Sequence, residues 1–132
     1  MKTKLSIAAV GLGMLLASVP AIAHHSFAAE FDAAKPIKLT GSVTKVEWMN
    51  PHTYFYIDVK DEKGTVTNWG LEMGSPNGLM RQGWTRNSMK IGDVVTVEGS
   101  AAKDGSNIGN ARSVTLAGGQ RLFAGSSQNT TP

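Results

Sequence analysis

Apolar and polar residues alternate along most of the chain after residue 36, which is typical of strands that bury one face. In the first such stretch the apolar positions are odd-numbered and then become even-numbered: Ile37, Leu39, Val43, Val46 and Trp48. Because side chains alternate along a strand with a period of two, this change predicts a β-bulge near Thr44 within one long strand. Gly41 stands just before it, where a strongly coiled strand favours a residue without a side chain.

The same alternation predicts four more main strands, separated by turn sequences. We expect them around Phe55–Val59, over Thr65–Met73, around Val95–Val97 and over Ile108–Leu116. A short strand at Leu122–Phe123 is expected to fold back on the last of them. The inward positions expected to be most deeply buried are Phe55, Trp69, Leu71, Val95 and Val97.

A short helix is predicted between the third and fourth strands. Ser75 can cap it, Pro76 suits its first position, and Gly83 can end it after Gln82.

The order of elements predicts an all-β fold, a small five-stranded OB-type barrel with one short helix between strands three and four. A β-sandwich is the alternative. The segment Ser26–Lys35 fits either a helix or a strand, and we favour an extended conformation there.

The first 23 residues have the three parts of a secretory signal peptide. Lys2 and Lys4 precede the apolar run Leu5–Val19, and Ala21 and Ala23 supply the small residues of a cleavage site. Cleavage after Ala23 is predicted, with cleavage after Ala21 or an uncleaved anchor as alternatives. The predicted organisation is a signal peptide (1–23), an amino-terminal segment (24–36), the barrel domain (37–125) and a disordered tail (126–132). The predicted location is the periplasm, or the medium, of a bacterium.

Composition narrows the range of partners. The chain has no cysteine, which excludes disulfides and thiolate metal sites. Its formal net charge of +3 would fall to +1 after cleavage, because Lys2 and Lys4 belong to the signal peptide. No cluster of basic residues is left to neutralise phosphates, so a nucleic-acid partner is not expected. We also expect no transmembrane span after cleavage.

Four long motifs carry a resemblance to a known family. They read "HHSFAAEFD", "VEWMNPHTYFY" (which contains "WMNPH"), "NWGLEMGSPNGLMRQGW" (which contains "GSPNGLMRQGW") and "GDVVTVEG". They resemble a family of small exported bacterial proteins catalogued as a domain of unknown function. The resemblance implies export and a small β-rich fold, and it implies no activity.

No catalytic arrangement stands out. No serine lies in a nucleophile-elbow glycine pattern, and no spacing marks two of the scattered carboxylates as an acid–base pair. We therefore do not expect an enzyme.

The histidines indicate a metal site instead. Cleavage after Ala23 would make His24 the first residue, and its α-amine and imidazole Nδ1 could then chelate one metal ion, as in the amino-terminal copper brace of several exported proteins. Amine and imidazole donors suit Cu(II), and also Zn and Ni. His52 in "WMNPH" or the adjacent His25 would be a third ligand, and Met49 adds a soft sulfur that favours Cu(I). Copper is therefore the candidate metal.

Two alternatives to the metal site remain open. His24 and His25 can be ordinary polar residues after a cleavage site, and His52 an ordinary turn residue. The protein would then be an OB-type binding module for a peptide, a glycan or an envelope component, with Tyr54, Tyr56 and Trp48 as contacts. Only the metal site needs a free amino terminus at His24.

Overall fold

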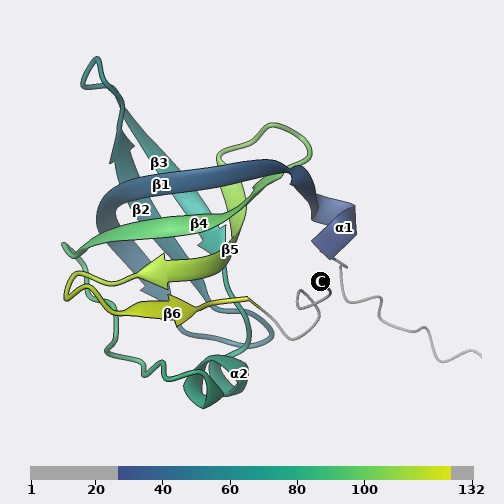
Figure 1. Cartoon of the computed structure of the whole chain (residues 1–132), viewed down its shortest axis with the longest axis vertical. Helices are drawn as coiled ribbons and strands as arrows, with labels where there is room; N and C mark the ends of the chain where they lie inside the picture. The colour runs from purple at the N-terminus through teal and green to yellow at the C-terminus, as the bar shows by residue number, and fades with distance from the viewer. Residues whose placement is uncertain (1–26, 126–132) are drawn as a thin grey trace, which may run out of the picture.

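Five strands close into a ring in the computed structural model of the chain, which describes residues 27–125 (Figure 1). The elements are α1 (Phe27–Glu30), β1 (Phe31–Glu47), β2 (Tyr54–Lys60), β3 (Val66–Glu72), α2 (Pro76–Arg81), β4 (Val94–Ala102), β5 (Ile108–Thr115) and β6 (Arg121–Phe123). The sheet order is β3-β2-β1-β4-β5-β6, and a parallel pairing of β3 with β5 closes the ring. The predicted five-stranded OB-type fold is confirmed, and the short β6 extends the sheet beyond β5.

The long strand β1 pairs with β2 on one side and with β4 on the other. The predicted bulge is present, because the register with β2 shifts between Val43 and Lys45. Gly41 has a steric reason to be glycine: a Cβ there would lie 2.4 Å from the carbonyl oxygen of Asp58. The close approach of β2 and the bulge together allow one strand to bend around two sides of the ring.

The hydrophobic core is built mainly from residues of the ring strands together with Leu79 of α2, the helix that lies below the ring in Figure 1. Four of the five positions predicted to be most deeply buried are buried: Phe55, Leu71, Val95 and Val97. The fifth prediction was wrong, because Trp69 is only partly buried. Trp69 does pair with the buried Ile57 on the inner face. However, the β2–β3 hairpin projects beyond the ring at the top of Figure 1, where less of the molecule covers that face.

The predicted helix between strands three and four is confirmed as α2. The Ser75 hydroxyl accepts a hydrogen bond from the Gly78 N–H at 3.2 Å, and Pro76 occupies the first turn. The expectation of an extended segment before residue 36 was wrong for Phe27–Glu30, which forms α1, and β1 already begins at Phe31. Within residues 27–125, no helix is long and apolar enough to cross a bilayer.

Candidate functional site

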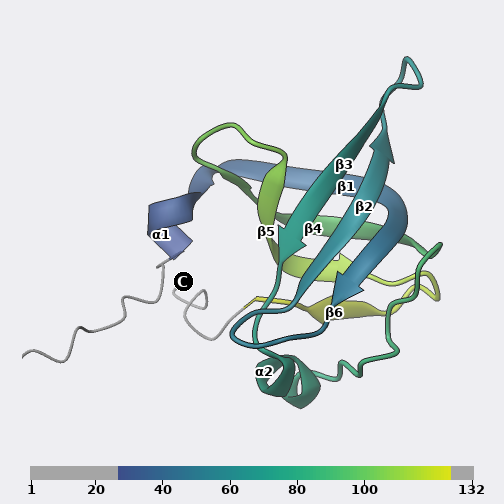
Figure 2. The same cartoon turned by 180° about the vertical axis from the view of Figure 1, so that it is seen from behind.

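A pocket of about 390 Å³ lies between α1, the start of β2, the end of β3 and the β4–β5 connection. Figure 2 shows α1 beside the ring, next to that connection. The polar side chains that line the pocket are Glu30, Tyr54, Glu72, Lys103, Asp104 and Ser106. Its apolar lining comes from Ala29, Phe31, Ala102 and Ile108. Concave surfaces of this size that combine apolar walls with a few polar groups are the usual form of ligand sites.

Two sheet pairings bring the far wall of the pocket together. The antiparallel β2–β3 hairpin places Tyr54 directly opposite Glu72. The parallel β3–β5 pairing then places Ile108 beside Gly70, at the point where the ring closes. The pocket therefore lies where the end of β3 meets the start of β5.

The near wall is α1, and two contacts hold it in place. The ring centroid of Phe27 lies 5.7 Å from that of Phe31, which is buried at the start of β1. The backbone N–H of Lys103 donates a hydrogen bond to the carbonyl oxygen of Glu30 at 2.9 Å. The helix α1 is thus held against the β4–β5 connection.

Glu72 links the pocket to His52. The Tyr54 hydroxyl donates a hydrogen bond to Glu72 Oε2 at 2.8 Å, and His52 Nδ1 lies 3.4 Å from Glu72 Oε1. The side chain of Glu72 is only 12% exposed, and that of His52 is 27% exposed. A buried carboxylate therefore lies between a phenol and an imidazole.

This environment changes the chemistry of Tyr54. Burial first, and then the hydrogen bond to Glu72 and its negative charge, raise the pKa of Tyr54 above its usual value. Each of these causes opposes formation of a second anion beside the carboxylate. Tyr54 therefore acts as a neutral hydrogen-bond donor.

We expect an alkaline spectrophotometric titration to detect this change. In a Tyr56→Phe variant, which leaves Tyr54 as the remaining tyrosine, phenolate absorbance should appear well above the usual midpoint of about pH 10. An additional Glu72→Ala substitution should move the midpoint back toward that value. A midpoint that is ordinary before Glu72 is removed would show that the phenol and the carboxylate are not in contact.

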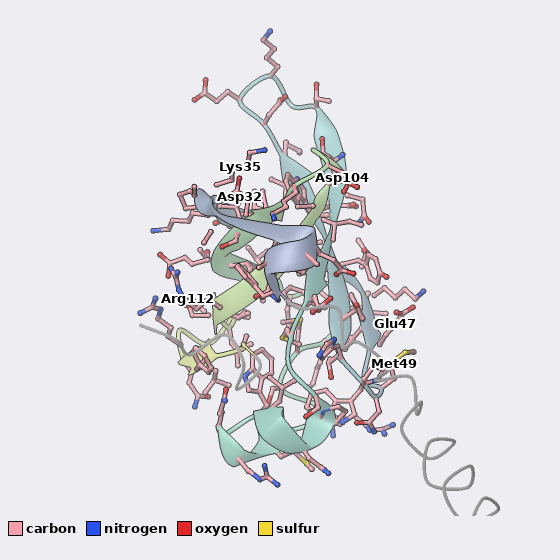
Figure 3. The ribbon with its side chains drawn as sticks, turned by 90° about the vertical axis from the view of Figure 1, so that its right-hand side faces the viewer. Asp32, Lys35, Glu47, Met49, Asp104 and Arg112 are labelled. Atoms are coloured by element: carbon pink, nitrogen blue, oxygen red, sulfur yellow. The ribbon has the colours of Figure 1, made fainter. Side chains whose placement is uncertain are left out.

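The structure separates the predicted metal ligands into two groups. His24 and His25 lie outside the described residues, so their positions are not defined. His52 and Met49 both lie in the β1–β2 connection, where Met49 is 48% exposed. Figure 3 shows Met49 and Glu47 low on one side of the molecule, with Asp104 higher, close to α1.

The predicted ligand-binding aromatic residues differ in their surroundings. Tyr54 belongs to the pocket wall, and Trp48 is partly buried against the core. Tyr56 lies on the outer face, where Lys45 Nζ is 5.4 Å from its ring centroid. Its ring also covers Gly70, since a Cβ on Gly70 would lie 3.1 Å from the ring atom Cε1 of Tyr56. Of these three side chains, Tyr54 alone contributes to the pocket.

Sequence reasoning missed the importance of Glu72 and Glu30. A signal for Glu72 was present, because the "DEKG" turn at Asp61–Gly64 sets a hairpin register that places Tyr54 opposite Glu72. No such local signal exists for Glu30, which reaches the pocket only through the packing of α1.

The described part of the chain does not form a complete metal site by itself. Among residues 27–125, no group of three or more histidines and carboxylates is placed to hold a metal ion. His52 and the pocket carboxylates would need further donors from outside this range.

A comparison of the sequence with models of protein families identifies the family of this chain. A family model described as a family of unknown function (DUF6152) matches residues 12–112. The chain belongs to this family. The match agrees with the resemblance of the sequence motifs and assigns no activity to DUF6152 proteins.

Two further comparisons concern curated proteins and solved structures. No curated protein matches the chain. Among solved structures, the DUF6152 domain is similar to the mitochondrial single-stranded DNA binding protein Rim1 from S. cerevisiae, with a TM-score of 0.50 and 12% identity. The similarity covers 62% of this chain and 92% of the yeast chain. At this identity the likeness supports the OB-type fold alone.

Proposed function

We propose that this DUF6152 protein is an exported metal-binding domain, that it works outside the cytoplasm without catalysing a reaction, and that Cu(II) is its metal. The α-amine and imidazole of His24 at a mature amino terminus would supply two ligands. His52 would supply a third, with His25 as the other candidate. The observation that supports this assignment best is that α1, which closely follows His24, forms a wall of the pocket whose opposite wall carries the partner of His52.

The reach of the chain supports the proposal. His24 precedes Phe27 by three residues, which span at most about 10 Å when extended. Phe27 packs on the buried Phe31, and the pocket lining begins at Ala29. A mature amino terminus at His24 would therefore lie within about 10 Å of Phe27, in the helix that lines the pocket with Glu72.

The donor set favours copper over harder cations. An amine and two imidazoles are borderline nitrogen donors, for which Cu(II) has the highest affinity among the common divalent ions of the first transition row. Glu30 and Glu72 add negative charge beside the site, which favours a cation. Met49, three residues before His52, supplies a thioether that would stabilise Cu(I) if the ion were reduced.

Substitution of each histidine tests the ligand set. We expect the exported protein to bind one Cu(II). His24→Ala should weaken that binding by more than about 100-fold, because removal of a residue that only supports a metal ligand already lowers metal affinity by up to about 100-fold. His52→Ala should weaken it less, by at least about 10-fold. Isothermal titration calorimetry measures both values.

Met80→Ala is the control, because Met80 is 52% exposed on α2 and does not line the pocket. It should leave the copper affinity unchanged. An unchanged affinity in His52→Ala, with His25→Ala reduced, would assign the third position to His25. Unchanged affinity in all three histidine variants would reject the metal site.

A binding module for a peptide, a glycan or an envelope component is the second candidate. The pocket itself favours it, because its volume and its combination of apolar walls with Tyr54 suit a small organic group. Such a ligand would bind equally well with or without a free amine at His24, which separates the two candidates.

A further inference from the structure

Glu72 has two carboxylate oxygens, and each lies next to a different side chain. Oε2 accepts the hydrogen bond of the Tyr54 hydroxyl at 2.8 Å, and Oε1 lies 3.4 Å from His52 Nδ1. The hydrogen bond to Tyr54 fixes the rotation of the carboxylate group. With Oε2 held in this way, Oε1 remains directed at the imidazole.

The backbone fixes the other partner of this contact. Thr53 lies between His52 and Tyr54 and is fully buried. Its N–H donates to the carbonyl oxygen of Gly74 at 3.0 Å, and its own carbonyl oxygen accepts from the Met73 N–H at 2.8 Å. These two bonds continue the pairing of β2 with β3 beyond the strand ends. His52 is therefore attached directly to a fixed residue on the same side as Glu72.

The contact determines where the imidazole carries its proton. A neutral imidazole has one N–H and one bare nitrogen. A bare Nδ1 would set its lone pair against the negative Oε1 atom, whereas an N–H at Nδ1 is attracted to it. The proton therefore belongs on Nδ1, and Nε2 keeps the lone pair that can bind a metal ion. Carboxylates that contact the far nitrogen of a ligating histidine orient the ring and increase its basicity.

We infer that Glu72 is a positioning residue for His52: it holds the imidazole in its Nδ1–H form, so that Nε2 is the atom presented to a metal ion. Tyr54 assists by fixing the rotation of the Glu72 carboxylate. The binding of a metal ion to Nε2 rests on the proposed function, whereas the Glu72–His52 contact does not depend on it.

Nitrogen NMR of the metal-free exported protein tests this assignment. In long-range ¹⁵N–¹H correlation spectra, recorded at alkaline pH with imidazoles neutral, His52 should show a protonated Nδ1 and a bare Nε2. Glu72→Ala should convert this single form into a mixture of both tautomers. Glu72→Gln, which keeps the shape but removes the charge, should give a weaker preference for Nδ1–H and remains testable if Glu72→Ala does not fold.

Glu47→Ala is the matched control. Glu47 lies opposite Tyr54 on the other side of β2 and pairs with Lys45, so the substitution removes the same charge from the same part of the sheet. It should leave the His52 tautomer and the copper affinity unchanged. Glu72→Ala should weaken Cu(II) binding by about 10-fold, and by no more than His52→Ala does, because Glu72 acts on the metal ion through His52.

The outcomes separate the two proposals. An Nε2–H tautomer in the unmodified protein, or a tautomer unaffected by Glu72→Ala, would overturn the positioning role even if copper binds. The expected tautomer in a protein that binds no copper would support the positioning role and reject the metal-binding function.

Discussion

Replacing Trp84 with alanine is expected to lower the free energy of unfolding by about 3–5 kcal/mol. Trp84 is 2% exposed and belongs to the central core cluster. Its indole Nε1–H donates a hydrogen bond to the carbonyl oxygen of Phe123 at 2.8 Å, which ties the segment after α2 to β6. The substitution would leave a cavity and remove the donor of that carbonyl. Since small domains have only about 5–15 kcal/mol of stability, this loss is a large share of the total.

Trp69→Ala is the matched comparison for this prediction. It removes the same side chain from a position that is only partly buried, opposite Ile57 in the β2–β3 pairing. The expected loss is clearly smaller than for Trp84→Ala. Urea unfolding followed by circular dichroism measures both, and equal losses would show that the two indoles are packed to a similar degree.

Much of the fold could be predicted because strand periodicity acts locally. The alternation at Phe55 and Ile57 directly identifies an inner and an outer face, and the change of parity near Thr44 identifies the bulge. Ser75 and Pro76 specify the start of α2 within two residues. Each of these signals is complete within a few neighbouring positions of the sequence.

The errors occurred where distant parts of the chain decide the outcome. Trp69 has the inner parity, but its burial depends on which other elements cover it, and it is only partly buried against the core. Phe27 and Phe31 fit a helix face as well as a strand, and the structure uses both: Phe27 lies in α1 while Phe31 begins β1. Alternation alone does not distinguish these possibilities.

The candidate site was predictable only in part for the same reason. His52 was identified from its residue type and its place after the first strand. Its partner Glu72 follows from the hairpin register, but the pocket also requires the β3–β5 closure and the docking of α1. Those contacts join segments that are far apart in the sequence.

The largest functional effect is expected from a change at the amino terminus. Acetylation of the His24 α-amine turns it into an amide nitrogen, whose lone pair is no longer available to the metal ion, and adds no new amine. The two-donor chelate of His24 is thereby lost, although no side chain is changed. We expect the acetylated form to retain the melting temperature of the form that begins at a free His24 and to lose stoichiometric Cu(II) binding.

Isothermal titration calorimetry of Cu(II) should compare two forms of the protein that both begin at His24, one with a free α-amine and one with that amine acetylated. Mass spectrometry establishes where each chain begins. We expect one tightly bound Cu(II) in the free form and binding weakened by more than about 100-fold in the acetylated form. Equal affinity in the two forms would show that the amino terminus and His52 do not form a copper site together, and would leave the pocket to be tested with organic ligands.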